Sequence, residues 1–491
     1  MDFVETVQVV IRRSYHDFLG FANNANQSAQ QVSFQRLTSQ LGVFVSYNMI
    51  PINRRMFDMY SLSLPHGLNF GDSLPIMAFQ SDDGTSCGAV LRHVRNRRFG
   101  FICLRRRVDY VWTLIGCDYG FLRYRTAKDA LARLMRDGLP LELVPSGVRV
   151  RPKLYESGST VVSPMFDFAR SRECYAGSWA LHEAYLALPN PDANWVSDCQ
   201  TSNFHARLWE AYLLACFREQ GCQVAQDQPS PDFYVSNTSG CEAWIEAVTA
   251  NAEPFDHSSA KAVETPNLLE RQIGSPAVRF ARTLRSKLQR KYELLPHVQG
   301  IPFAIALSDY HAPGSLVWSR NALPAYLYGV NMVIEEKNGA PVGTIYSHST
   351  LLDVNSIRSG LFLEPENSGI SAVIFSNDGS IAKFQRMGFL AGIKQDDVAM
   401  VRTGILFSRV PGAAGPTLFE HDIASAEYAS IWPPNGETWS MELDVFHNPM
   451  AKHPLSFDLL PKCTHWFKQG EEILCRYSNE FSVLGSRTFI E

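Results

Sequence analysis

The most continuous hydrophobic pattern in the chain lies between Ser202 and Gly221. The run FHARLWEAYLLACFREQ contains no proline, Ser202 or Asn203 can cap its first turn, and Gly221 can end it. Apolar side chains cover most of the circumference at helical spacing, which predicts a helix buried on nearly all sides. Glu210 lies within an apolar arc of this helix, so its carboxylate is expected to need a cation or a hydrogen-bond donor.

Two short strands are predicted after this helix. The first is PDFYV, from Pro231 to Val235, and the second is CEAWIEAVTA, with the polar turn SNTSG between them. Alternation along the second run places Glu246 on the same face as Trp244 and Val248. Asp232 and Glu246 are therefore expected on neighbouring strands of one hairpin, where two carboxylates can share a divalent cation that prefers oxygen ligands. The alternative is an exposed hairpin edge, because acidic residues are common near strand ends.

A basic helix is predicted from Pro276 to Leu295, and the apolar run IPFAIALSD after it is typical of a buried strand. Lys287 and Lys291 lie within about 60° of the apolar face centred on Leu284. They are expected either to extend from the edge of the core or to reach towards an acidic site. Four arginines of the same helix lie on the other side, which is typical of a solvated face: Arg279, Arg282, Arg285 and Arg290.

Upstream, the pattern changes to short strands, tight turns and many arginines. The runs AFQSDDGTSCGAVLRHV and RRFGFICLRRRVDYVWTLIG predict hairpin strands, and TAKDALARLMRDG predicts a helix after them. Residues 85–150 hold 13 Lys and Arg against 5 Asp and Glu, although the whole chain has a net charge of −4. Arginines interleaved with aromatic residues are typical of surfaces that bind phosphates and stack bases, which predicts a nucleic-acid-binding set: Arg95, Arg97, Arg98, Arg105, Arg106 and Arg107. The alternative is a solvated strand face whose aromatic residues point into the core.

Composition limits the class of protein. A chain of 491 residues with 45% hydrophobic and 19% charged residues allows several globular domains with a sizeable core. No signal peptide is evident and no apolar run reaches the roughly 18 residues of a membrane helix, so a cytoplasmic protein without a membrane partner is expected. The ten cysteines never form a C-x-x-C pair, which argues against structural zinc and a disulfide framework. Neither a G-x-x-x-x-G-K-[ST] loop nor a G-x-S-x-G elbow occurs, which disfavours an ATPase motor and an α/β-hydrolase.

The run ISAVIFS, from Ile370 to Ser376, is expected to extend the sheet of the central segment. His447 and His453 flank two prolines in FHNPMAKHPL, where a structural role is favoured over a metal or catalytic one. Together the patterns predict five regions: an N-terminal adaptor segment (1–78), a basic β-rich module (79–150), a helical linker (151–200), a catalytic core (201–400) and a C-terminal extension packed on that core (401–491).

The order of helix, strand pair, basic helix and apolar strand, together with the acidic residues, resembles the core of the PD-(D/E)XK (restriction-endonuclease-like) nuclease superfamily. That superfamily has an αβββαβ core with a proline-aspartate on one strand, (D/E)-x-K on the next and often a glutamate on the first helix. Pro231-Asp232 matches the first element, Glu246 the second and Glu210 the helical acid. The resemblance implies an α/β (α+β) fold, with this core beside a smaller β-rich N-terminal module.

One position departs from the superfamily pattern. The lysine expected two residues after Glu246 is replaced by Val248. Some members recruit the lysine from a neighbouring helix, so the resemblance makes Lys287 or Lys291 the expected replacement. Otherwise the site has lost a catalytic part.

The function that the resemblance implies is a metal-dependent endonuclease that hydrolyses phosphodiester bonds of nucleic acid, with DNA favoured over RNA. Mg²⁺ or Mn²⁺ would be held by Asp232, Glu246 and the carbonyl of Ala247, with Glu210 as a further candidate ligand. The resemblance also suggests a role in bacterial defence against phage, and it leaves open a homo-oligomer or a partner subunit. The alternative is a nuclease-like scaffold that has lost catalysis and acts as a nucleic-acid-binding or protein-binding module.

Overall fold

Eight strands from different parts of the chain form one mixed sheet, in the order β19-β18-β17-β14-β9-β8-β7-β6. Strands β8, β9 and β14 are parallel, whereas β6 with β7, β7 with β8, and β14 with β17 are antiparallel. The structure, a computed structural model, describes residues 49–490 except 157–160, 252–266, 312–313, 338–339, 348, 352–353, 411–414, 435 and 471. The eight strands are β6 (Gln223–Ala225), β7 (Phe233–Ser236), β8 (Glu242–Asn251), β9 (Phe303–Tyr310), β14 (Ala372–Phe375), β17 (Asp444–His447), β18 (Thr464–Gln469) and β19 (Glu472–Arg476).

The predicted helix and strand pair are present. The helix is α7 (Phe204–Glu219), and the strand pair is β7 and β8, which are antiparallel neighbours. Along the chain, α7 is followed by β6, β7 and β8, then by the short helix α8 (Leu268–Ile273), by α9 (Ser275–Leu288) and by β9. The described chain therefore contains helix, three strands, helix and strand in the predicted order, with α8 added before the second long helix.

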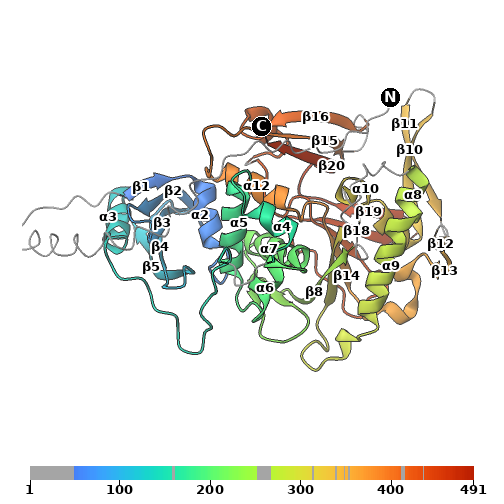
Figure 1. The fold of residues 1–491 in the computed structure, drawn as a ribbon, viewed down its shortest axis with the longest axis horizontal. Helices are drawn as coiled ribbons and strands as arrows, with labels where there is room; N and C mark the ends of the chain where they lie inside the picture. Colours follow the sequence, from blue (N-terminus) through green and yellow to red (C-terminus); the bar gives the residue numbers. More distant parts are fainter. Residues whose placement is uncertain are drawn as a thin grey trace, which may run out of the picture.

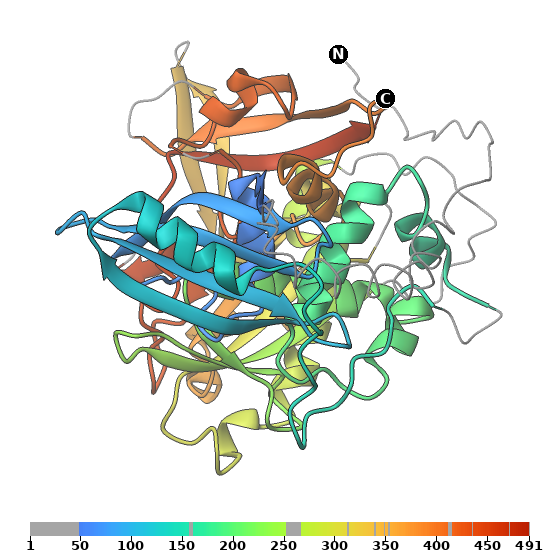
Figure 2. The same cartoon turned by 90° about the vertical axis from the view of Figure 1, so that its left-hand side faces the viewer.

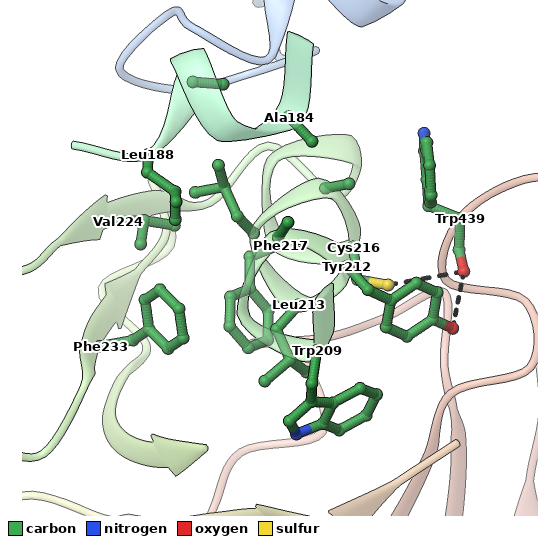
Figure 3. Packing of buried hydrophobic residues seen from close by; sticks show 14 of the residues in the cluster. Ala184, Leu188, Trp209, Tyr212, Leu213, Cys216, Phe217, Val224, Phe233 and Trp439 are labelled. Carbon is green, nitrogen blue, oxygen red and sulfur yellow. Dashed lines mark hydrogen bonds between the residues drawn. The ribbon is translucent and has the colours of Figure 1, made fainter. Parts of the chain in front are cut away.

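Helices cover both faces of the large sheet. Ala243 and Ile245 of β8 pack in the same core as α7, whereas Trp244 and Val248 pack in a second core with α9 and α11 (Ala322–Tyr328). This alternation confirms the side-chain pattern predicted for β8. Figure 3 shows how α7 is buried: Phe217 faces Phe233 of the sheet, and Tyr212 donates a hydrogen bond to the backbone oxygen of Trp439 at 3.1 Å. A helix with so little polar surface is fixed mainly by burial.

The arginine-rich region forms a separate five-stranded antiparallel sheet, seen at the front of Figure 2. Helix α3 (Tyr124–Leu134) packs on one side of it and α2 (Arg54–Ser61) on the other, so the predicted hairpins and helix are confirmed. The predicted boundary between residues 78 and 79 is wrong, because it falls within β2 and the sheet already begins at residue 49. Its strands are β1 (Met49–Ile52), β2 (Ser73–Ser81), β3 (Ser86–His93), β4 (Phe99–Arg106) and β5 (Trp112–Phe121).

The predicted linker is part of the main body of the protein. It forms α4 (Pro164–Ala169), α5 (Tyr175–Ala187) and α6 (Trp195–Gln200), and α5 contacts both α7 and α12 (Ile381–Leu390). Two small hairpins follow α11: β10 (Val330–Lys337) with β11 (Ala340–Ser347), and β12 (Thr350–Leu351) with β13 (Val354–Arg358).

The C-terminal region contributes to two sheets. Strand β14 lies within the run ISAVIFS and pairs with β9, which confirms that this run extends the core sheet. Residues 401–491, predicted as an extension packed on the core, also supply part of the core itself, because β17, β18 and β19 are strands of the large sheet. The other strands, β15 (Met400–Ser408), β16 (Thr417–Asp422) and β20 (Phe481–Ile490), form a three-stranded sheet at the top of Figure 1. No helix of the described chain is long and apolar enough to cross a membrane.

Candidate functional site

Asp232 and Glu246 lie at the point where β7 and β8 pair. Asp232 immediately precedes β7, and its Oδ2 accepts a hydrogen bond of 2.7 Å from the backbone N–H of Ala247 in β8. Glu246 occupies the middle of β8, and its residue is only 4% exposed. The hairpin thus brings both predicted carboxyl groups to one place because the two strands pair in this register.

The carboxylate of Glu246 is held by two donors on the same oxygen. Lys287 Nζ, from the last turn of α9, lies 2.6 Å from Oε1, and the hydroxyl of Tyr292 donates to the same atom at 2.7 Å. The second oxygen, Oε2, is buried and has no hydrogen-bond partner. A buried carboxylate oxygen without a donor is unusual, and a ligand or water normally completes it.

Glu210 belongs to the same group of acids but is tied to its own partners. Its Oε2 accepts a hydrogen bond from Trp195 Nε1 at 2.8 Å, and Arg207 Nη1 lies 2.8 Å from Oε1. Burial raises the pKa of the Glu210 carboxyl, and Arg207 opposes this rise. Glu210 is therefore placed beside the hairpin by α7, with both of its oxygens already hydrogen-bonded.

The local electrostatics favour a cation at this site. Burial raises the pKa of Asp232 well above its usual range, and the carboxyl groups of Glu246 and Glu210 raise it further. The N–H of Ala247 and the charge of Lys287 act in the opposite direction. Several carboxyl groups in a buried place cannot all be ionised unless positive charge compensates them. A divalent cation would supply that charge, and the unpaired oxygen of Glu246 fits a cation ligand.

The two candidate lysines have different positions. Lys287 points to Glu246, on the face of β8 that also carries Val248. The prediction that Lys291 lies on an inward helical face is wrong, because α9 ends at Leu288 rather than at Leu295. Lys291 adopts a left-handed backbone conformation (φ +54°), and its side chain is half-exposed. The basic helix therefore brings one of the two lysines to the acids.

Tyr292 was not predicted as a site residue. It lies in a short 3₁₀ turn directly after α9, and its hydroxyl also accepts a hydrogen bond from Arg290 at 3.1 Å. A helix continued through this segment would have placed Tyr292 elsewhere. The positive φ at Lys291, which redirects the chain, has no signal in the sequence because lysine seldom adopts it.

A second group of acidic residues, elsewhere in the protein, has ligand atoms close enough together to hold a metal ion. Among the described residues, Asp378, Glu437 and Glu442 form a trio with ligand atoms within 4.8 Å of one another, whereas Glu210, Asp232 and Glu246 do not meet this spacing. However, three buried cations already compensate the trio: Lys383 lies 2.7 Å from Glu437, Arg386 lies 2.6 Å from Asp378, and Arg402 lies 2.8 Å from Glu442. We call these six residues the ion-pair cluster. Its charges balance, so it has the composition of a structural cluster rather than a metal site.

The predicted arginine set divides into two groups. Arg95, Arg97 and Arg98 are exposed at the turn between β3 and β4. The prediction that Arg105, Arg106 and Arg107 contact phosphates is wrong, because their guanidinium groups are mostly buried in ion pairs within the protein. Their partners are Glu142 at 3.3 Å, Glu183 at 2.5 Å and Asp109 at 2.7 Å, in that order. Arg106 also lies over the ring of Trp112, so it joins the small sheet to α5.

The two histidines of the C-terminal proline-rich turn have different environments. His447 is buried at the end of β17, and its Nε2 lies 2.9 Å from Nδ1 of His465. His465 Nε2 in turn lies 2.9 Å from the backbone oxygen of Leu460, to which it can only donate. His465 Nδ1 is therefore an acceptor, and His447 Nε2 donates to it. His453 is exposed.

No family model, curated protein or solved structure matches this chain.

Proposed function

We propose that this chain is a metal-dependent nuclease that hydrolyses phosphodiester bonds of nucleic acid, with DNA favoured over RNA. The observation that carries the proposal is the contact between Lys287 and Glu246, at 2.6 Å, beside Asp232. It supplies, from α9, the positive charge that the superfamily pattern places two residues after Glu246 and that Val248 cannot provide. Two acids and a lysine in one place are the parts that this chemistry needs.

The order of the elements supports the same proposal. Helix α7, strands β6 to β8, helix α9 and strand β9 follow the αβββαβ order of the superfamily, and α7 and α9 lie on opposite faces of the sheet. The acids also occupy the corresponding elements: Glu210 on the first helix, Asp232 at the second strand and Glu246 on the third. This agreement of order and position supports the resemblance more strongly than the short motif does.

Asp232 and Glu246 would hold the cation, Mg²⁺ or Mn²⁺, with the backbone carbonyl of Ala247 as the further ligand that the resemblance implies. The cation would supply a Lewis acid and activate water for attack on phosphorus. The chain itself supplies the remaining parts. Lys287 places a fixed positive charge at the site, where it can orient water or stabilise negative charge that develops on the phosphate. Tyr292 holds the same carboxylate oxygen as Lys287, which leaves the other oxygen of Glu246 for the cation.

The test uses two lysines of one segment as a matched pair. Lys287→Met and Lys291→Met are compared with the wild type in cleavage of fluorescent single-stranded and duplex DNA and RNA, with Mg²⁺, with Mn²⁺ and with EDTA. We expect Lys287→Met to lose at least about 100-fold in rate, the usual scale for removal of a group that stabilises the transition state. Lys291→Met should cleave at the wild-type rate because its side chain is half-exposed and lies 4.0 Å from Glu293 rather than beside Glu246.

The competing function is a binding module without catalysis, which the loss of the usual lysine at Val248 favours. It predicts nucleic-acid binding by the wild type, no turnover with either metal and no effect of EDTA. A role in defence against phage rests on the resemblance alone. Unchanged phage sensitivity after deletion of the gene would count against it.

A further inference from the structure

The chain leaves two adjacent parallel strands, β9 and β14, on opposite sides of the large sheet. After β9 it enters α10 (Ser315–Trp318) and then α11, whose Ala322 and Leu323 pack in the core on the α9 side. After β14 it enters α12, whose Phe384 and Met387 pack in the core on the α7 side. In open α/β sheets, such a change of side marks a crevice at the carboxyl ends of the strands, and ligands bind there.

A cavity of about 180 Å³ lies at this point. Its walls come from α10, from the turn between β14 and α12, and from β20 of the three-stranded sheet, which lies above these helices in Figure 1. A single water needs only about 10–15 Å³, so the cavity can hold a small organic molecule.

This cavity is distinct from the acidic site. Glu246 pairs in register with Ile305, near the start of β9, whereas the cavity lies beyond Tyr310, at the end of that strand. Five residues of strand separate the two positions, a distance of roughly 16 Å along the sheet. A ligand in this cavity would therefore be independent of the proposed nuclease activity.

Three polar side chains of the cavity wall have hydrogen-bonding capacity that the protein does not use: Asn377, Ser486 and Thr488. Both the oxygen and the nitrogen of the Asn377 carboxamide are buried without a hydrogen-bond partner. Ser486 Oγ accepts a hydrogen bond from Arg402 Nε at 2.9 Å, and Thr488 Oγ1 accepts one from Arg386 Nη1 at 2.9 Å. Each of these two hydroxyl groups therefore keeps its own hydrogen to donate. A ligand for these three side chains needs one donor and several acceptors, with a donor and an acceptor side by side for Asn377.

The remaining wall favours a neutral ring. The charged side chains that line the cavity balance, because Asp378 and Glu442 are accompanied by Arg386 and Arg487. A charged ligand would disturb this balance, whereas a neutral one would not. Apolar contacts for the faces of a ring come from Leu316, Val317 and Val483.

We propose that the cavity binds a neutral purine base, with adenine as the preferred ligand. An asparagine carboxamide matches the N6 and N7 edge of adenine, because its oxygen accepts from N6 and its nitrogen donates to N7. The hydroxyl groups of Ser486 and Thr488 would donate to the other ring nitrogens. Hypoxanthine has the same ring system but presents two acceptors at this edge, so one carboxamide cannot pair with both of its atoms.

The experiment is isothermal titration calorimetry of the full chain with adenine and with hypoxanthine. We expect adenine to bind the wild type and hypoxanthine to bind at least tenfold more weakly. Asn377→Ala should weaken adenine binding at least tenfold without lowering the melting temperature, because the side chain has no protein partner to lose. Ala382→Leu, at a position that lines the cavity, should block binding by filling it.

Three results would overturn the proposal. The first is no binding of adenine to the wild type at millimolar concentration. The second is equal affinity for adenine and hypoxanthine. The third is unchanged adenine affinity in both Asn377→Ala and Ala382→Leu, which would place any bound base elsewhere on the protein.

Discussion

Replacement of Glu437 by glutamine is expected to destabilise the protein strongly. Glu437 is fully buried at the centre of the ion-pair cluster, where it contacts Lys383 at 2.7 Å and Arg386 at 2.9 Å. Burial alone would raise the pKa of Glu437, but Arg386, Lys383 and Arg402 hold it well below its usual range. Glutamine has the same shape without the charge, so the substitution leaves three buried cations with two carboxylates.

The expected cost follows from the desolvation of those cations. Removing one partner of a buried ion pair destabilises a protein by about 3–5 kcal/mol, because the other charge stays buried without compensation. Native proteins are stable by about 5–15 kcal/mol, so the substitution removes a large part of the total. Asp458→Asn is the matched control, because its pair with Arg476 is exposed on both sides and such pairs contribute about 0–1 kcal/mol.

Equilibrium unfolding in guanidinium chloride, followed by tryptophan fluorescence, measures both variants. Trp432 is a suitable reporter because it packs on Tyr428, whose hydroxyl donates to Glu437. In Asp232→Asn, which lacks a ligand of the proposed nuclease cation, EDTA should leave the unfolding midpoint unchanged, because protein cations rather than a metal balance the acids of the cluster. A Glu437→Gln variant within about 1 kcal/mol of the wild type, or an Asp232→Asn midpoint lowered by EDTA, would refute the structural interpretation of this cluster.

Two further predictions concern pH and salt. Burial lowers the pKa of His447 to about 3 and that of His465 to about 4. In the unfolded chain these histidines take up protons near pH 6.5, whereas in the folded protein they stay neutral down to their lowered pKa. The free energy of unfolding is therefore at its full value above pH 6.5 and falls towards pH 4, by about 1.4 kcal/mol per pH unit for each histidine. His447→Gln keeps a donor for His465 but removes one titrating group. In urea unfolding at several pH values, the change in unfolding free energy per pH unit should be smaller by the contribution of one histidine. An unchanged pH dependence would contradict the low pKa assigned to His447. Simultaneous change of Arg95, Arg97 and Arg98 to glutamate should weaken DNA binding and reduce the salt dependence by up to about 0.9 logarithmic units for each phosphate that the protein no longer neutralises. An unaltered slope in fluorescence anisotropy titrations would show that these arginines do not bind phosphates.

Local patterns were sufficient for much of the core. The apolar circumference of α7 and the alternation of β8 depend on each element's own periodicity, and both were correctly predicted. The β7–β8 pairing followed from the polar turn between them, and it was enough to bring Asp232 near Glu246. Lys287 was one of two candidates, since periodicity gives the face of a helix but not its last residue.

The errors arose where partners are distant in sequence or where the backbone changes direction. Arg105 and Arg106 have the composition of a phosphate-binding strand, but their partners, Glu142 and Glu183, lie in other elements. Hydrophobic periodicity contains no information about such pairs. The ion-pair cluster was missed for the same reason, because its charges come from the turn between β14 and α12, from α12 and β15, and from the loop before β17. The position of Tyr292 depends on the left-handed conformation of Lys291, which the residue type disfavours.

The most direct measurement of the central claim is single-turnover cleavage of DNA by the wild type and by Asp232→Asn, with Mg²⁺ and with EDTA. Asparagine retains an oxygen that can accept the hydrogen bond from Ala247, so the hairpin should be preserved while the charge is removed. We predict Mg²⁺-dependent cleavage by the wild type, none in EDTA, and a rate at least about 100-fold lower in Asp232→Asn at unchanged melting temperature. Equal Mg²⁺-dependent cleavage by the two proteins would contradict the assignment of Asp232 and Glu246 as the catalytic metal site.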